Sequence, residues 1–218
     1  MKKHEVAELE PRSIGTSVLR REDPRLLTGR GQYVADMVLP HMLHIAIARS
    51  PYAHARIVSV DVDGARAVPG VELVWTGKDT APLSIGIATQ AAVEGFQATI
   101  QPIMAQDIVR YAGEAVAVVV AESRHIAEDA LQFIHVEYEE LTPLVDAESA
   151  IESETLANES LKSNVVLRSS RITDDVDAIF TASPCVVEGN FVNSRVNASP
   201  METRGGIARY EWVSQQLT

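Results

Sequence analysis

The stretch that decides the fold is EAVAVVVAESRHIAEDALQFIHVEYEEL, residues 114–141. It begins with a continuous apolar run rich in valine, 114–122, which is typical of a strand buried on both faces. Ser123 is a suitable N-cap, and the residues after it predict a helix with an apolar stripe. The stripe consists of Ile126, Ala127, Ala130, Leu131 and Ile134. A second strand, 134–141, completes a strand–helix–strand unit, whose crossover is right-handed if the two strands pair in parallel.

The segments before this unit also have strand composition. We expect strands at 42–49, 56–63 and 71–77, because β-branched residues and alternation dominate there. A short helical turn closed by Pro and Gly, 64–70, separates the last two. Residues 78–105 contain scattered Gly, Pro, Thr and Gln, which predicts a long loop with at most short strands.

The composition changes after this unit. Five acidic residues among small polar ones predict a surface connector at 146–160. Further on, the pattern predicts a strand at 165–172, a short Asp-capped helix at 175–183 and a long strand at 185–196. The closing stretch SPMETRGGIARYEWVSQQLT, 199–218, is typical of a strand, a polar turn and the start of another strand.

Bulk composition excludes several classes of protein. With 30 acidic and 19 basic residues the formal net charge is −11, which argues against a general nucleic-acid binder. Cys185 is the single cysteine, so an internal disulfide cannot form. The longest apolar run, 115–121, is too short to span a membrane, and no apolar stretch follows the lysines near the N-terminus. We therefore expect no membrane partner and a cytoplasmic location.

Basic residues gather near the N-terminus. The segment 12–30 contains five arginines and little periodicity, which predicts an extended arm. They are Arg12, Arg20, Arg21, Arg25 and Arg30. The arm is either a solvated loop or a docking element for an acidic partner surface.

Residue chemistry alone identifies no active site. His41 and His44 lie three apart, and on a strand such residues face opposite sides and cannot share a metal. Ser50 and His54 resemble a nucleophile and its base, but nothing near them in the sequence supplies an orienting acid or an oxyanion hole. The glycines of TGRGQY and ETRGGIA fit neither dinucleotide nor P-loop patterns. We assign no catalytic, cofactor-binding or metal residue.

Four motifs, in order, resemble the N-terminal part of the molybdopterin-binding large subunit of molybdenum hydroxylases, the xanthine dehydrogenase, aldehyde oxidase and aerobic carbon monoxide dehydrogenase family. They are GTSVLRREDPRLLTGRGQYVAD (15–36), MLHIAIARSPYAHARIVSVDVDGARAVPGVELVWTGKD (42–79), PIMAQDIVRYAGEAVAVVVAESRHIAEDALQFIHVEYEELTPLVDAESAI (102–151) and DDVDAIFTASPCVVEGNFVNSRVNASPMETRGGIARYE (174–211). Their serial order over most of the chain makes the resemblance specific.

The resemblance implies an α+β fold in several parts. An extended N-terminal arm, 1–24, precedes an α/β-hammerhead domain at 25–145. The acidic connector, 146–160, follows, and 161–218 resembles a truncated start of the molybdopterin-binding domain. Matching residues within these parts have structural explanations. Glu202 and Arg204 are expected to pack and hydrogen-bond at a domain edge, with a cofactor contact as the alternative. Gly113 and Glu114 are expected to form a turn before a buried strand.

The resemblance further implies an N-terminal fragment or split piece of a catalytic subunit, an oxidoreductase that is not competent alone. Complete subunits hydroxylate an aldehyde, an N-heterocycle or carbon monoxide with water-derived oxygen. The family's Ser-Thr-Gln segment, pterin-binding glycines and catalytic glutamate have no counterparts in this chain. Molybdopterin is therefore expected only in the complete subunit, with an iron–sulfur subunit and a flavin subunit as partners. The alternative is a non-catalytic hammerhead module that acts in assembly or subunit binding. The sequence does not identify the substrate.

Overall fold

The computed structural model describes residues 15, 17–173 and 175–218. The chain divides into two compact units, each described by itself below. The larger unit is Pro40–Gly189; the smaller combines Met1–Leu39 with Asn190–Thr218. Arg12 of the predicted arm lies outside the described residues.

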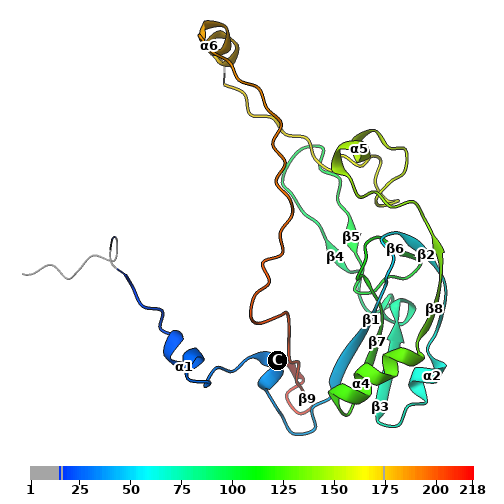
Figure 1. Ribbon diagram of the computed structural model, residues 1–218. Coiled ribbons are helices and arrows are strands. Elements are labelled where there is room, and N and C mark those ends of the chain that lie inside the picture. The colour runs from blue at the N-terminus through cyan, green and yellow to red at the C-terminus, as the bar shows by residue number, and fades with distance from the viewer. Residues whose placement is uncertain (1–14, 16, 174) are drawn as a thin grey trace, which may run out of the picture. The chain divides into compact units, whose positions relative to one another are not determined.

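Two three-stranded antiparallel sheets form the framework of the larger unit (Figure 1). In the first sheet, β7 (Ala115–Ala121) lies between β1 (His44–Arg49) and β3 (Val71–Thr76). In the second, β2 is the central strand, flanked by β6 and β8. The bounds of the second sheet's strands are Ala55–Asp61 for β2, Ile108–Val109 for β6 and His135–Glu140 for β8. All the long strands lie where the sequence predicts them.

Strand β7 is buried on both faces, as its valine-rich sequence predicts. Successive side chains of a strand point to opposite faces. Val119 and Ala121 therefore join one core cluster, which includes Ala127 and Ala130 of the following helix. Val116, on the other face, joins a second cluster with residues of β2 and β6. This strand thus contributes to both cores of the unit.

The helix after β7 packs on the first sheet. Helix α4 (Arg124–Ala130) is capped by Ser123, whose Oγ accepts a hydrogen bond from the backbone N–H of Ile126 at 3.2 Å. Its buried alanines bring the helix close to β1 and β7 (Figure 1). A short 3-10 helix, η2 (Leu131–Phe133), leads into β8. The cap and the apolar stripe are both confirmed.

The two strands of the strand–helix–strand unit do not pair with each other. Both edges of β7 are occupied by antiparallel partners, β1 and β3, while β8 pairs antiparallel with β2 in the other sheet. The right-handed parallel crossover therefore does not arise. Helix α4 instead carries the chain from one sheet to the next.

The remaining elements of the larger unit are short. Helices α2 (Asp63–Arg66) and α3 (Gly77–Thr80) flank β3. The long loop predicted at 78–105 contains one two-residue pairing, β4 (Ile87–Ala88) with β5 (Ile100–Gln101). Further along the chain are α5 (Ala147–Glu152), inside the acidic stretch, and α6 (Val176–Ala182).

Two predicted strands are absent from the described structure. Residues 165–172 and 185–196 are assigned to no helix or strand. A strand requires a neighbouring strand for its backbone hydrogen bonds, and these segments have none within the described chain. The prediction of a formed strand is therefore wrong for both segments, although their composition is typical of strands. The helix predicted at 175–183 is present, with Asp175 at the N-cap position but without a side-chain cap bond.

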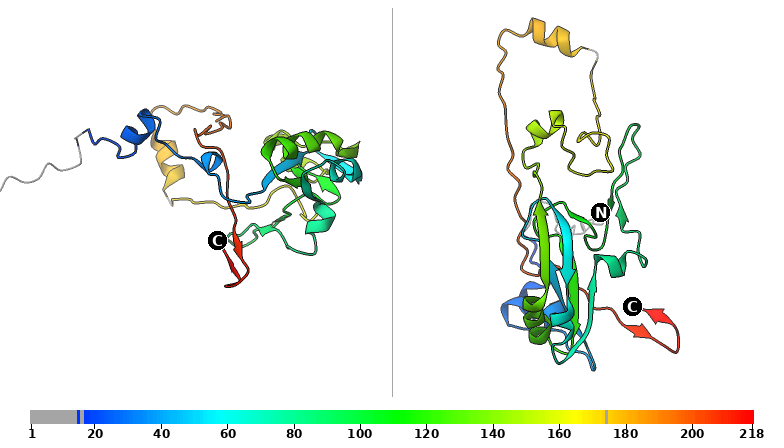
Figure 2. Two further views of the ribbon diagram at one scale, coloured as in Figure 1. Left: turned by 90° about the horizontal axis from the view of Figure 1, so that it is seen from below. Right: turned by 90° about the vertical axis from the view of Figure 1, so that its right-hand side faces the viewer.

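The smaller unit has little regular structure. Its elements are α1 (Asp23–Leu27), η1 (Val34–Asp36) and a terminal hairpin of β9 (Tyr210–Glu211) with β10 (Gln216–Leu217) (Figure 2). The hairpin is antiparallel, and none of the unit's described residues is buried. This unit therefore has no hydrophobic core of its own.

Candidate functional site

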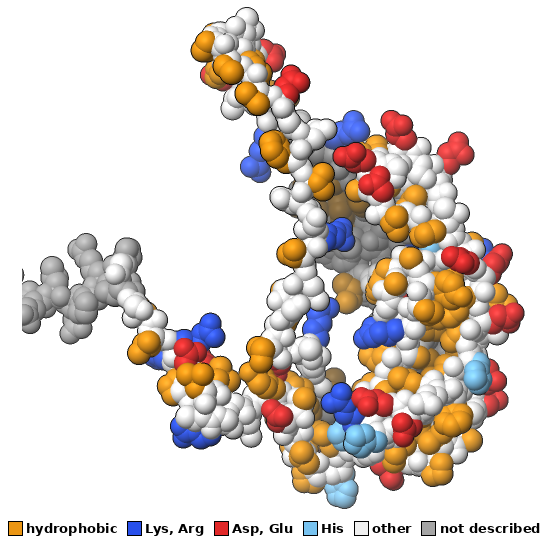
Figure 3. Space-filling model, viewed as in Figure 1, with side chains coloured by type: hydrophobic (Ala, Val, Ile, Leu, Met, Phe, Trp, Pro, Cys, Tyr) orange, Lys and Arg blue, Asp and Glu red, His pale blue; other side chains and the backbone are white. Residues whose placement is uncertain are grey.

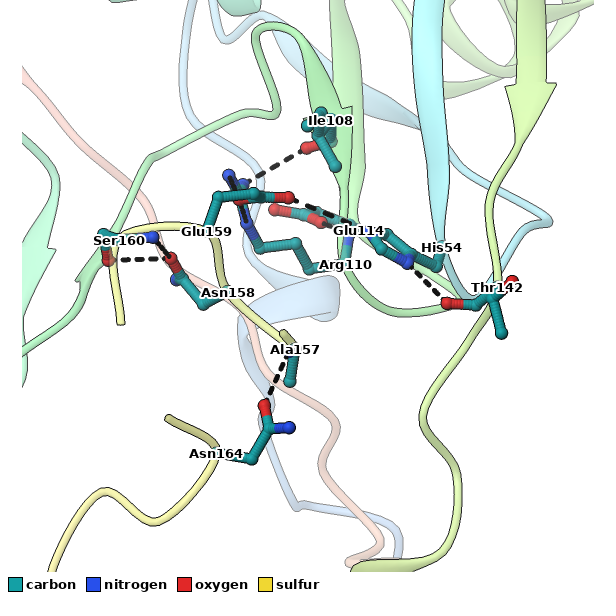
Figure 4. A network of polar contacts seen from close by, with 10 residues as sticks. All are labelled: His54, Ile108, Arg110, Glu114, Thr142, Ala157, Asn158, Glu159, Ser160 and Asn164. Carbon is teal, nitrogen blue, oxygen red and sulfur yellow. Dashed lines mark hydrogen bonds and ion pairs between the residues drawn. The ribbon is translucent and has the colours of Figure 1, made fainter. Parts of the chain in front are cut away.

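A network of polar side chains joins three separate parts of the larger unit (Figure 4). His54 comes from the entry to β2, and Arg110 from the turn after β6. Glu114 precedes β7, and Glu159 belongs to the acidic stretch 146–160, called the acidic connector below. The network contains the largest fully buried side chain in the described structure, that of Glu114.

Glu114 anchors the turn before β7. Its Oε2 accepts a hydrogen bond from the backbone N–H of Arg110 at 2.6 Å, and its Oε1 accepts one from Nε2 of Gln101 at 3.1 Å. The side chain is 2% exposed, so both bonds offset the cost of burying a carboxylate. Gly113 just before it has φ of +90°, a conformation that favours glycine. The expected turn is confirmed.

The guanidinium of Arg110 holds the acidic connector. Its Nη2 and Nε donate to Oε2 of Glu159 at 2.6 and 3.1 Å, and its Nη1 donates to the carbonyl of Ile108 at 3.3 Å. Burial raises the pKa of Glu159, but hydrogen bonds from its own backbone N–H and from Arg110, together with the positive charge of Arg110, outweigh this. The net effect lowers the pKa, so Glu159 is ionised at neutral pH.

His54 completes the network. Its ring is largely buried, and Nδ1 lies 2.8 Å from the carbonyl oxygen of Thr142. Nε2 lies 3.8 Å from Oε1 of Glu159 and, within the described structure, has no hydrogen-bond partner. The ring therefore faces a carbonyl on one side and a carboxylate on the other.

Ser50 and His54 do not form a nucleophile–base pair. The Oγ of Ser50 accepts from the backbone N–H of Tyr52 at 3.0 Å and donates to the carbonyl of the same residue at 3.2 Å. Ser50 is 2% exposed, which keeps it from a substrate. Tyr52 in turn packs against Tyr138 with ring centroids 5.1 Å apart. Burial raises the pKa of Tyr138, and Ser50 opposes this by hydrogen bonding.

In the described structure, no common site brings together His41, His44 and Cys185. His44 is the first residue of β1, whereas His41 lies before the strand with φ of +58°, so the premise that one strand carries both was wrong. Cys185 is exposed. Across the described residues, no group of three or more His, Cys, Asp or Glu side chains is arranged to hold a metal ion.

Residues of the smaller unit make local contacts. The backbone N–H of Val34 donates to Oε1 of Glu202 at 2.9 Å, in keeping with a hydrogen-bonding role for this glutamate. In the predicted arm, Nε of Arg20 lies 3.8 Å from Asp23, and Nε of Arg30 donates to Oγ1 of Thr28 at 3.0 Å. These contacts fit a solvated arm and do not test docking to an acidic partner.

Large apolar side chains are exposed along residues 186–213 (Figure 3). Phe191 is 94% exposed and Val213 is 98% exposed. The others are Val186, Val187, Val192, Val196, Met201, Tyr210 and Trp212.

A hollow of about 360 Å³ lies beside β1 and β8. Ile47, Val116 and Leu131 line it, together with Arg49 and Tyr138. Nη1 of Arg49 already donates to the carbonyl of Gly113 at 2.9 Å. The hollow therefore brings together no acid–base pair from the residues that line it.

Two small antiparallel sheets joined through a helix, with a buried polar turn between them, define an α+β domain of the hammerhead type. The sequence of residues 28–142 matches the family described as aldehyde oxidase and xanthine dehydrogenase, a/b hammerhead domain. The chain belongs to this family.

Relatives extend the similarity over almost the whole chain. Quinoline 2-oxidoreductase from Pseudomonas putida 86 is 61% identical, with a TM-score of 0.87 over 100% of this chain and 28% of that one. The nicotine 6-hydroxylase large subunit of Paenarthrobacter nicotinovorans is 44% identical over 94% of this chain and 25% of its own length. A Cu,Mo-CO dehydrogenase is 32% identical, with a TM-score of 0.76 over 93% of this chain and 27% of that one.

The chain spans about a quarter of the length of the curated relatives it matches. Relatives include proteins described as a large molybdopterin subunit, from Eubacterium barkeri, and as a molybdenum-binding subunit, from Escherichia coli. Among the described residues, no helix is both long and apolar enough to cross a membrane.

Proposed function

We propose that this chain forms the hammerhead part of the catalytic large subunit of a molybdenum hydroxylase and is not competent alone. The observation that carries the proposal is the 61% identity to quinoline 2-oxidoreductase over the full length of this chain, against 28% of the length of that enzyme. On this proposal the chain is an N-terminal piece of the subunit, whether a fragment or a split part, and the remainder of the subunit is its first partner.

The proposed role is structural within an oxidoreductase. In the described residues no ligand cluster converges, and the Ser50–His54 pair is engaged elsewhere. We assign no chemical step to these residues and propose that molybdopterin is held only by the complete subunit. Molybdopterin supplies the redox chemistry in the complete subunit. Iron–sulfur and flavin subunits are proposed as electron-transfer partners, and the cytoplasm as the location.

The exposed apolar side chains along residues 186–213 support the proposal that a partner covers this segment. Phe191 and Val213 are more than nine-tenths exposed, and the backbone of 185–196 pairs with no strand in the described chain. Burying such side chains contributes roughly 25 cal/mol per Å² of apolar surface. We propose that the remainder of the molybdopterin-binding subunit supplies the strands and the apolar surface that cover this segment.

For the substrate of the complete enzyme we propose an N-heteroaromatic compound. Two relatives at 61% and 44% identity are named for quinoline and nicotine. Relatives named for carbon monoxide dehydrogenase are less similar, at 30–38% identity. The substrate-binding loops themselves are proposed to lie in the remainder of the subunit.

The test is co-purification with cofactor analysis. The tagged chain is produced alone and together with the remainder of a large subunit taken from a homologous enzyme, and molybdenum is measured by mass spectrometry. We expect no molybdenum with the chain alone and stoichiometric molybdenum in the complex. Stoichiometric cofactor on the chain alone would contradict the proposal that it cannot hold molybdopterin.

A second candidate is a non-catalytic hammerhead module that acts in assembly or subunit binding. The self-contained cores of the larger unit favour it, because the unit can fold without a catalytic domain. A neighbouring reading frame that encodes a Ser-Thr-Gln segment and pterin-binding glycines would favour the split subunit. Capture of iron–sulfur or flavin subunits without any molybdenum-bearing partner would favour the module.

A further inference from the structure

We propose that the face of the first sheet opposite helix α4 is a docking surface for the remainder of the large subunit. This inference rests on the proposed function and adds a second contact to the one at residues 186–213. The surface is called the open face below. It consists of two residues from each strand of the sheet: Ile45 and Ile47 of β1, Val118 and Val120 of β7, and Leu73 and Trp75 of β3.

The strand register gathers these six side chains into two rows. Residues that lie directly opposite each other in an antiparallel pair place their side chains on the same face of the sheet. The first row consists of Ile45, Val120 and Leu73. The second row, next to it, consists of Ile47, Val118 and Trp75. The open face is therefore one continuous apolar surface that crosses all three strands.

The alternate residues of the same strands face the helix instead. Ala46, Val74 and Val119 are buried in the core cluster that also contains the alanines of α4 (Figure 1). In the described structure, neither core cluster includes a residue of the open face or has one packed against it. The second cluster buries only Val116, at one end of this side of β7. Beyond Val116, the open face therefore has no covering layer in the larger unit.

The composition of the open face is not that of a surface that stays in water. An antiparallel sheet with one solvated face alternates apolar and polar residues, as β8 does with the exposed Glu137 and Glu139. On the open face the outward residues are apolar as well. Ile45 is 65% exposed and Ile47 is 38% exposed, while the four on β7 and β3 are half-buried. A sheet that is apolar on both sides is expected to be covered on both sides.

The chemistry of the open face favours a permanently attached neighbour. None of its six side chains is charged, and permanent interfaces are more apolar than those that form and dissociate. On the proposed function, the remainder of the large subunit is such a neighbour. It is also extensive, because the matched region makes up only 28% of quinoline 2-oxidoreductase and 25% of the nicotine 6-hydroxylase large subunit.

Thiol labelling tests this coverage directly. In a Cys185→Ser background, Ile45→Cys places a thiol on the open face, and His125→Cys places one on the exposed side of α4 as a control. A maleimide is applied to the full 218-residue chain alone and to its complex with the remainder of a homologous large subunit. We expect labelling of Ile45→Cys to slow by about tenfold or more in the complex, and labelling of His125→Cys to change by less than about twofold.

A binding measurement provides an independent readout. Ile45→Asp should weaken binding to the remainder by about tenfold, because it buries a charge in an apolar contact. Val58→Asp, on a 52% exposed valine of β2, is the matched control and should change the affinity by less than about twofold. Circular dichroism confirms that both variants are folded, and the labelling experiment needs neither of them.

The outcomes separate this inference from the proposed function. If the parent chain forms a molybdenum-containing complex in which Ile45→Cys is labelled as fast as in the chain alone, the inference fails and the proposed function stands. If the parent chain forms no such complex, the proposed function fails. Protection of the Ile45→Cys thiol in the chain alone, or a dimer that Ile45→Asp dissociates in sedimentation, would place this chain itself on the open face and overturn the inference.

Discussion

Replacing Glu114 with methionine should destabilise the larger unit more than any surface substitution. Methionine is close to glutamate in volume, so the change removes two acceptors without opening a large cavity. The backbone N–H of Arg110, now bonded at 2.6 Å, would be left without its partner. The amide of Gln101 can turn toward water, because its residue is exposed.

The expected loss of stability follows from the two donors that bond to Glu114, the backbone N–H of Arg110 and the side-chain amide of Gln101. A hydrogen bond to a charged acceptor contributes about 1.5–3 kcal/mol, and a buried donor without a partner costs about 1–3 kcal/mol. Removing the buried charge recovers part of this, since the carboxylate no longer has to be desolvated. We therefore expect a loss of about 2–3 kcal/mol in the free energy of unfolding. Glu114→Gln keeps one acceptor for Arg110 and should cost about 1 kcal/mol.

Urea unfolding followed by circular dichroism measures the difference. The matched control is Glu122→Met, at an exposed position just after β7, which should change stability by less than about 0.5 kcal/mol. The expected order of destabilisation is Glu114→Met, then Glu114→Gln, then the control. If Glu114→Met unfolds at the same urea concentration as Glu122→Met, the buried carboxylate does not organise this turn.

Three further predictions concern the cap, the core and a carboxylate. Ser123→Ala should cost about 1 kcal/mol in urea unfolding, whereas Ser123→Asp should retain the cap of α4; equal stability of both variants would refute the capping role. Val119→Ala should cost about 2 kcal/mol, while Val187→Ala, on an exposed side chain, should cost nothing measurable in this chain; a comparable loss at both positions would contradict the assigned burial. Hydrogen bonds from the backbone and hydroxyl of Thr76 lower the pKa of Asp79, so its contribution to stability is present above the ordinary aspartate value and is lost as pH falls through the folded pKa. Carboxyl NMR titration should show this pKa rising in Thr76→Val, and an unchanged titration would count against the hydroxyl's part.

Local sequence pattern predicted the elements of the larger unit but not their pairing. Ser123 and the alternating burial of β7 could be read from spacing, because caps and strand faces are set by near neighbours. Strands β1 and β3 both pair with β7 and so exclude β8 from that sheet. This pairing depends on contacts between residues that lie far apart in sequence. Composition alone does not record such contacts.

The polar network was beyond prediction for the same reason. The short separation in sequence suggests His54 as a base for Ser50, yet the ring lies against the carbonyl of Thr142 and beside the carboxylate of Glu159. Strand composition at 185–196 was also a true local signal, but a strand forms only when a partner strand is present. Composition therefore indicates which secondary structure a segment can adopt, and tertiary contacts decide whether the segment adopts it.

The claim that the remainder of a large subunit covers residues 185–196 is tested most directly by hydrogen exchange. The measurement compares the chain alone with the chain bound to the remainder of a large subunit. In the chain alone, we expect amides of 160–218 to exchange faster than those of 40–145, because no described residue after Leu161 is buried. In the complex, amides of 185–196 should become protected as they join a sheet. Equal protection of both regions in the isolated chain, or no gain in protection on binding, would contradict the account.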